Sequence, residues 1–327
     1  MKRRKIQPKR VLVTGSEGFV GRHLAQAVTS LRGTAVGVDL PGSGADIEMD
    51  LGEPDLDPEA LMKEAGAVDA IIWMAAKITR GSSVDGDARR NLTAIAEAPV
   101  RVLETYAAAG KGLPHLVLCS TFKMYGPPRD DAAIDPEDPP QSPDPHSYGS
   151  AKFLAERLAE IATARLGVRH AVVRPSCIYG PGQHSHNAIP RFLQAALDGE
   201  SPVVFGDGAS LRDDVFAPDL SRLMAQAALQ RAHGAFHASG DRSRTIAEVA
   251  QVCCEAVAAE GGPEVQPKLD ASKSPKWWID QRFDRSASDR DLSYRPVELL
   301  EGLRRQVRWM KAGADAADTM DFGKGTR

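Results

Sequence analysis

Short apolar runs alternate with amphipathic helical patterns along the first half of the chain. The apolar runs are residues 11–15, 34–40, 68–76, 115–121 and 170–176, and the helical patterns are residues 19–31, 91–109 and 148–166. The runs are almost continuously apolar, as expected of strands that helices cover on both faces. Strands that alternate with helices predict an α/β fold with a doubly wound parallel sheet, the Rossmann arrangement.

Length and charge narrow the class of protein. The chain has 327 residues and carries 41 basic against 44 acidic side chains, a net charge of −3. This length is enough for about two domains. Because there is no basic excess, we do not expect a nucleic-acid partner. No apolar run approaches the roughly 18 residues that a membrane span needs, so we expect no membrane association.

The N-terminus and the cysteines bear on location. Residues 1–10 are basic, but no apolar run follows them as it would in a signal peptide. We expect a solvated tail, with contact to phosphate or acidic lipid as the alternative. The cysteines, Cys119, Cys177, Cys253 and Cys254, lack the spacing of metal sites. We therefore expect reduced thiols, no metal site and a cytoplasmic location.

Three glycines follow the first predicted strand at intervals of three residues. Gly15, Gly18 and Gly21 lie where that strand ends and a helix begins. Gly15 permits a tight turn, Gly18 lets a pyrophosphate approach the backbone, and Gly21 allows close contact between helix and strand. The helix N-terminus offers N–H groups and a positive dipole end to phosphates. In this context the pattern predicts a dinucleotide-binding site.

Two acidic residues extend this predicted site. Asp39 ends the second predicted strand, 24 positions after Gly15. A carboxylate there can accept hydrogen bonds from both adenosine ribose hydroxyls and would repel a 2′-phosphate, for which Leu40 and Pro41 supply no compensating cation. Asp39 therefore favours NAD over NADP, the alternative being a solvated residue at a strand end. Asp50 is a candidate partner for the adenine amino group, and the sequence alone does not decide whether it makes this contact.

Tyr148 and Lys152 form a candidate catalytic pair. They are spaced i, i+4 and share one face of the predicted helix 148–166. Free tyrosine has a pKa of about 10. A neighbouring ammonium and an oxidised nicotinamide favour the phenolate, so we expect the pKa of Tyr148 to be lowered. The lowered pKa would make Tyr148 a general base near neutral pH.

Taken in order, these motifs resemble the extended short-chain dehydrogenase/reductase family, in the branch of NAD-dependent nucleotide-sugar epimerases and dehydratases that includes UDP-glucose 4-epimerases. The resemblance covers roughly residues 10–310. The matching segments are Thr14–Gly21, Asp39, Asp50, Asn91, Ser120–Gly126, Tyr148 with Lys152, Arg174–Gly182, Gly206–Asp213 and Asp219. Their joint order and spacing make the resemblance specific.

The resemblance implies roles for individual residues. Thr121 would hold the sugar 4-hydroxyl, Tyr148 would take its proton, and Lys152 would hold the nicotinamide ribose. The cofactor would contact Gly15, Glu17, Gly18, Phe19, Val20, Asp39, Asp50, Leu51, Ala75, Ala76, Asn91, Tyr148, Lys152 and Pro175. Asn91 could instead be a helix-surface residue. Arg212 would clamp the substrate diphosphate with its fork of donors, the alternative being a salt bridge with Asp213 or Asp219.

The chain also departs from the family pattern. Trp73 stands where the family often has a histidine, which would alter the packing around the cofactor. Phe122 and Lys123 follow Thr121. In sugar-nucleotide 4,6-dehydratases the corresponding two positions resemble Asp-Glu, the acid and base that eliminate water. Phe122 cannot move a proton, so these residues argue against dehydration, and Lys123 also argues against decarboxylation. Lys123 either pairs with a carboxylate or phosphate of the substrate or points to solvent. A second basic residue for the diphosphate is expected near Lys273, Lys276 or Arg282.

The combined hypothesis is an NAD-dependent epimerase of a nucleotide-activated sugar that inverts C4 through a transient 4-keto intermediate. Dehydratase or 4-ketoreductase activity on the same substrate class is an alternative, and so is a non-catalytic NAD-binding sensor. We expect residues 1–175, with part of 211–246, to form the NAD-binding Rossmann domain. Residues 176–327 would mainly form a smaller α/β domain that binds the nucleotide sugar. The family also implies a homodimer, through helices 91–109 and 148–166.

Overall fold

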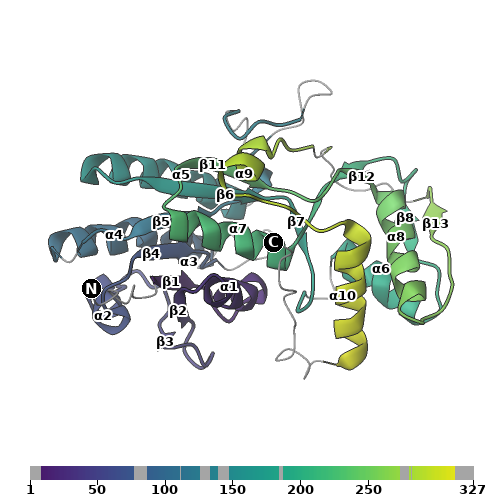
Figure 1. The fold of residues 1–327 in the computed structure, drawn as a ribbon, viewed down its shortest axis with the longest axis horizontal. Coiled ribbons are helices and arrows are strands. Elements are labelled where there is room, and N and C mark those ends of the chain that lie inside the picture. Colours follow the sequence, from purple (N-terminus) through teal and green to yellow (C-terminus); the bar gives the residue numbers. More distant parts are fainter. Residues whose placement is uncertain are drawn as a thin grey trace, which may run out of the picture.

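The computed structural model contains one large sheet of seven parallel strands, in the order β11-β6-β5-β4-β1-β2-β3 (Figure 1). The structure describes residues 9–76, 87–110, 112–125, 133–138, 147–183, 187–272, 280 and 282–313. The strands of this sheet are β1 (Arg10–Thr14), β2 (Thr34–Asp39), β3 (Ile47–Glu48), β4 (Ala70–Trp73), β5 (His115–Cys119), β6 (His170–Pro175) and β11 (Gly234–Ala238). The sheet confirms the predicted Rossmann fold. Residues 1–8 of the basic tail, Lys273 and Lys276 lie outside the described residues.

Helices cover both faces of the sheet, which explains its apolar strands. On one face, α1 (Phe19–Ser30) packs against α7 (Ala217–Gln230), and their buried side chains share one apolar core with Val11 and Val13. The opposite face carries α2 (Pro58–Ala65), α4 (Ala98–Ala108) and α5 (Ser147–Leu166). Leu12, which alternates with Val11 and Val13 along β1, packs on that side. Successive side chains of a strand point to opposite faces, so both faces must be apolar.

The predicted continuous helix over residues 91–109 is wrong in its first part. The structure has α3 (Asp87–Leu92), a π-helical turn η1 (Thr93–Glu97) and then α4. The backbone N–H of Ala98 bonds to the carbonyl of Thr93, five residues earlier. Pro99 follows and has no N–H to donate. The periodicity of apolar residues did not reveal this break because all three segments are helical.

The second half of the chain builds a smaller unit beside the sheet, at the right of Figure 1. Its elements are β7 (Cys177–Tyr179), α6 (Ala188–Leu197), β8 (Val203–Phe205), β9 (Leu211–Arg212), β10 (Asp214–Phe216), β12 (Arg244–Thr245), α8 (Ile246–Ala259), β13 (Lys268–Asp270) and α10 (Leu299–Ala312). The short helix α9 (Ser286–Asp291) lies instead against β11 of the large sheet. Three two-stranded sheets pair β7 with β10, β8 with β13, and β9 with β12. Tyr179, Leu193, Val257 and Leu303 belong to a separate apolar core between α6, α8 and α10.

The chain crosses between the two units more than once. After β10, the chain returns to the large sheet through α7 and β11, then leaves again for β12 and α8. The domain boundary at residues 175 and 176 therefore stays a prediction. Within the described part of the chain, no helix is long and apolar enough to cross a membrane. The same residues contain no group of three or more histidine, cysteine or carboxylate side chains placed to hold a metal ion.

Candidate active site

A pocket of ≈ 1070 Å³ lies along the carboxyl ends of the large sheet. The strand order reverses between β1 and β4, and such a switch point is where open α/β sheets bind ligands. The pocket wall includes every residue to which a cofactor or substrate contact was assigned: Gly15, Glu17, Gly18, Phe19, Val20, Asp39, Asp50, Leu51, Ala75, Ala76, Asn91, Thr121, Lys123, Tyr148, Lys152, Pro175 and Arg212. The fold therefore brings together residues that are almost 200 positions apart in sequence. Arg282, a candidate for the second basic residue at the diphosphate, is not part of this wall.

The glycine turn connects β1 to the start of α1 at one side of this pocket. Gly15 has a φ of 74°, a left-handed conformation that favours glycine. A Cβ on Gly21 would lie 2.0 Å from the carbonyl oxygen of Gly15. No side chain caps the N-terminus of α1 at Gly18, and its first turn has no acidic residue. The turn thus presents close backbone and a positive helix end to the pocket, as a pyrophosphate requires.

Asp39 closes the turn from β2. Its Oδ2 accepts a hydrogen bond from the backbone N–H of Glu17 at 2.7 Å, and its Oδ1 accepts one from that of Leu40 at 2.8 Å. Each carboxylate oxygen has two lone pairs, so Asp39 can hold the turn and still accept from ribose hydroxyls. The turn and this carboxylate together fit the adenosine and pyrophosphate parts of NAD.

Asp50 is engaged by a cation that the sequence reasoning missed. Its Oδ2 accepts a hydrogen bond from Arg90 at 3.0 Å, and its Oδ1 accepts one from the backbone N–H of Gly52 at 2.8 Å. Arg90 also pairs with Glu53 and lines the pocket. Asp50 therefore reaches the pocket wall as half of an ion pair. The adenine contact predicted for Asp50 remains a prediction.

Thr121 and Lys123 are held together by a short 3-10 turn, η2 (Phe122–Met124), directly after β5. The Thr121 hydroxyl oxygen accepts the backbone N–H of Lys123 at 3.3 Å and so caps this turn. The Thr121 side chain is almost wholly buried at the pocket wall. Phe122 packs edge-on against Phe283, with ring centroids 6.0 Å apart. The turn thus places Thr121 and Lys123 together on one wall of the pocket.

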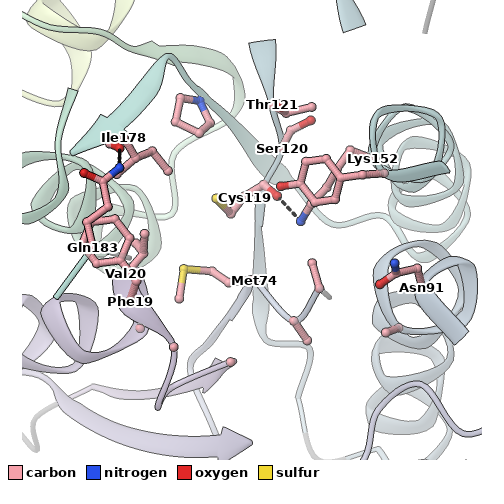
Figure 2. Close-up of a pocket in the computed structure, with 18 of the residues that line it drawn as sticks. Phe19, Val20, Met74, Asn91, Cys119, Ser120, Thr121, Lys152, Ile178 and Gln183 are labelled. Atoms are coloured by element: carbon pink, nitrogen blue, oxygen red, sulfur yellow. Dashed lines mark hydrogen bonds between the residues drawn. The ribbon is translucent and has the colours of Figure 1, made fainter. Parts of the chain in front are cut away.

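Lys152 is buried beneath this wall. Its Nζ donates a hydrogen bond to the carbonyl oxygen of Cys119 at 2.6 Å, and it lies 5.7 Å from the ring centroid of Tyr148 (Figure 2). Desolvation by burial lowers the pKa of Lys152. Burial also raises the pKa of Tyr148 well above its ordinary value, and Cys119 adds to the rise. This rise is that of the protein groups alone, and the expected lowering of the Tyr148 pKa, which also depends on an oxidised nicotinamide, stays a prediction.

Asn91 projects from α3 toward the pocket, across from Phe19 and Val20 (Figure 2). Only 2% of its surface is exposed, so it is not a helix-surface residue. Ala94, one turn later in η1, lines the same pocket. Behind them Trp73, which stands in place of the family histidine, is 1% exposed and contacts η1 through its indole N–H.

Arg212 lines the pocket as a member of an ion pair. Its guanidinium makes a two-pronged contact with the carboxylate of Asp214, and both side chains are buried. The alternative of a salt bridge with Asp213 or Asp219 named the wrong partners. Those two carboxylates accept backbone N–H groups instead, and burial raises the pKa of each to about 6.

Arg174 belongs to a buried network just behind the site and not to the pocket wall. It forms two hydrogen bonds to Glu156, at 2.7 and 3.0 Å, and donates to the hydroxyl oxygen of Tyr125 at 2.5 Å. Tyr125 in turn contacts Nε2 of His237 at 2.8 Å. Because Glu156 lies one helical turn after Lys152 on α5, this network fixes the helix that carries Tyr148 and Lys152.

Several wall residues were missed by the sequence reasoning. They are Met74, Arg90, Ile178, Gln183, Asn187 and Asp214 among others. Figure 2 shows Met74 between the glycine turn and Lys152, and Gln183 donates to the carbonyl oxygen of Ile178 at 2.5 Å. Most of them adjoin a matched motif in sequence, and that adjacency is the signal that could have found them. No residue pattern marks them as ligand contacts.

Comparison with known proteins agrees with this geometry. A family model described as "NAD dependent epimerase/dehydratase family" matches residues 11–237. The chain is 27% identical to a UDP-glucose 4-epimerase of Mycolicibacterium smegmatis, over 92% of this chain and 98% of the relative. It is equally 27% identical to a dTDP-glucose 4,6-dehydratase of an Actinoplanes species, over 93% and 98%.

The fold is also found in solved structures. A dTDP-glucose 4,6-dehydratase from Bacillus anthracis in complex with NAD superposes with a TM-score of 0.76 at 19% identity, covering 94% of this chain and 98% of that one. The family match spans the glycine turn, Thr121, Tyr148 and Lys152, and it confirms NAD as the predicted cofactor. On this match and on the shared fold, the chain belongs to the NAD dependent epimerase/dehydratase family of enzymes.

Proposed function

We propose that this enzyme inverts C4 of a nucleotide-activated sugar. The observation that carries the proposal is the wall formed by Thr121, Tyr148 and Lys152, on which Phe122 and Lys123 take the two places beside Thr121. The M. smegmatis relative is a 4-epimerase and the Actinoplanes relative is a dehydratase, so family membership alone supports either reaction. The residues beside Thr121 favour the epimerase.

The proposed mechanism uses three side chains. The Thr121 hydroxyl holds the sugar 4-hydroxyl, and the Tyr148 oxygen takes its proton as the C4–O bond becomes a carbonyl. NAD, held by the glycine turn, Asp39 and Lys152, would in its oxidised form supply a reversible hydride acceptor for C4 and a positive charge that favours the Tyr148 phenolate. Tyr148 then gives the proton back to the oxygen. Lys152 stays anchored on the Cys119 carbonyl and holds the ribose.

Phe122 supports this reaction over dehydration. Elimination across C5 and C6 needs one group that removes a proton and another that protonates the departing hydroxyl. Phe122 has no titratable atom, and its ring packs against Phe283 in an apolar cluster with Met124 and Tyr125. Lys123 places a basic side chain at the position where the dehydratases have an acidic one. The site therefore lacks, beside Thr121, the pair of side chains that would eliminate water from a 4-keto sugar formed there.

Two basic residues are proposed to bind the substrate. Lys123, tied to Thr121 through the capped turn, meets a negative group on the sugar, and Arg212 meets the diphosphate while still paired with Asp214. We expect Lys123→Met to raise KM for a sugar acid at least tenfold and to leave KM for the matching neutral sugar within threefold. Steady-state kinetics on a UDP-glucuronic acid and UDP-glucose pair measures this. Equal effects on both substrates would contradict a contact with the sugar.

We also propose that two copies of the chain pair through α4 and α5. The side chains of Leu154 and Ile161 on α5 are 38% and 58% exposed. They are seven residues apart, which places them on one face of the helix. A second copy of the same face would cover them, as a two-fold interface requires.

The deciding experiment is proton NMR of the purified enzyme with UDP-, dTDP-, GDP- and CDP-sugars in deuterated water. Epimerisation at C4 gives a new anomeric signal with no deuterium incorporated, whereas dehydration gives a deuterated methyl group and would contradict our interpretation of Phe122. A ketoreductase would consume reduced cofactor in proportion to product. A non-catalytic sensor would bind NAD and convert none of the sugars.

Tyr148→Phe tests the mechanism itself. It removes the hydroxyl that moves the proton and leaves the ring in place. We expect turnover to fall at least 100-fold, within the range that a general acid–base group supplies, while NAD still binds. Turnover equal to the wild type would refute the role of Tyr148.

A further inference from the structure

Trp73 occupies the last position of β4, directly beneath the helix that carries Asn91. Its side chain is 1% exposed, and its indole Nε1–H donates a hydrogen bond to the carbonyl oxygen of Ala94 at 2.8 Å. The acceptor lies within η1, and Ala94 and Asn91 both line the pocket. This bond therefore joins the sheet to the helical segment that forms one wall of the cofactor site.

The Ala94 carbonyl has lost both of its ordinary helical donors. In an α-helix it would accept from the N–H of Ala98, but that N–H bonds to the carbonyl of Thr93. In a continued π-helix it would accept from residue 99, which is proline and has no N–H. A buried carbonyl without a partner is destabilising. The indole of Trp73 supplies the missing donor.

The π-helical turn also decides where Asn91 points. One residue more per turn rotates everything before η1 by about 100° relative to α4. On α4, Val102, Leu103 and Tyr106 pack into the core behind the pocket. With that face fixed, a reversion of η1 to α-helix would swing Asn91 away from the pocket.

We infer that Trp73 is a positioning residue for the cofactor site. Its indole N–H donates to the Ala94 carbonyl, which Pro99 leaves without a backbone donor, and so stabilises the π-helical turn. This turn keeps Asn91 on the pocket wall. The inference concerns NAD binding and does not depend on which carbon of the sugar is inverted. It gives a tryptophan at this position a chemical task, since phenylalanine would fill similar space without the N–H.

Four proteins test this inference: the wild type, Trp73→Phe, Pro99→Ala, and the double variant. NAD affinity is measured by fluorescence titration of the folded protein, and stability by thermal unfolding without NAD. We expect Trp73→Phe to raise the Kd for NAD about tenfold, which is about 1.4 kcal/mol. In the double variant the N–H of residue 99 becomes a donor for the Ala94 carbonyl. The Kd of the double variant for NAD should then differ less than threefold from the Kd of the single variant Pro99→Ala.

Two results would overturn the inference. An unchanged Kd in Trp73→Phe, even with a lowered melting temperature, means that Trp73 only fills the core. Equal losses of NAD affinity with and without Pro99 mean that the indole N–H does not support the site. Trp73 would then act through its packing near Lys152, with which it borders a small internal space. If Trp73→Phe does not fold, we expect the double variant to fold, and a double variant that also fails would refute the role of the N–H.

Discussion

Replacing Gly21 with alanine is the most direct perturbation of the cofactor turn. The added Cβ would lie 2.0 Å from the Gly15 carbonyl oxygen and 2.6 Å from that of Ser16. Ordinary contact begins at 3.4 Å, and both opposing atoms belong to the backbone, so no side chain can swing away. The turn must move by roughly 1 Å or more. Such a displacement misaligns the N–H groups that face the pyrophosphate.

The expected loss can be given a magnitude. A misplacement of about 1 Å can cost about 100-fold in a positioned interaction, and we expect a loss of this size in NAD affinity, or about 2.7 kcal/mol. Overpacking of this kind should also lower the free energy of unfolding by about 1–3 kcal/mol. Calorimetric titration with NAD and urea unfolding without NAD measure the two effects separately.

Two matched variants sharpen the comparison. A Cβ on Gly18 would lie 3.3 Å from the Gly15 carbonyl oxygen, so Gly18→Ala should leave stability nearly unchanged and weaken only NAD binding, by crowding the pyrophosphate. Gly66, at the end of α2, has a φ of 69° and nothing within 4 Å of its Cβ position. Gly66→Ala should cost about 1–3 kcal/mol of stability and leave NAD affinity unchanged. A Gly21→Ala enzyme that binds NAD like the wild type would refute the argument.

Three further perturbations test the buried charges and the exposed face of α5. Burial raises the folded-state pKa of Asp213 to about 6. The wild type therefore loses stability as the pH rises from about 4 to about 6, because the buried carboxyl must then ionise. Asp213→Asn has no such group, so its free energy of unfolding should rise relative to that of the wild type by about 3 kcal/mol between about pH 3.5 and about pH 7.5. Urea unfolding at both pH values checks this, and a constant difference contradicts it. Arg174→Met leaves Glu156, 1% exposed, without its partner and should cost about 3–5 kcal/mol. Glu156→Gln in the same chain should recover part of that loss in urea unfolding, and a cost below about 1 kcal/mol would argue against the pair. Ile161→Glu should convert a dimer to a monomer in light scattering, and a wild-type monomer would exclude the interface.

Local sequence was enough for the Rossmann half of the fold. The glycine turn spans only seven consecutive residues, from Gly15 to Gly21, and its backbone geometry leaves glycine as the residue that fits. The flanking strands are short, apolar and bounded, so their positions agree with β1, β2, β5 and β6 to within about two residues. The second half was harder because several of its strands have only two or three residues and carry no periodic signal.

The sequence by itself determined the fold class, the cofactor turn and the set of chemical groups available, because each depends on the residue types within a short stretch of chain. Tertiary structure decided how those groups behave. It buried Tyr148, so that burial raises the pKa of the phenol in the protein alone, whereas the sequence predicted a lowering by Lys152 and an oxidised nicotinamide together. It paired Arg212 with Asp214, and it set Trp73 against a carbonyl 21 residues away. Burial and pairing arise from contacts between distant segments, and only the folded chain makes those contacts.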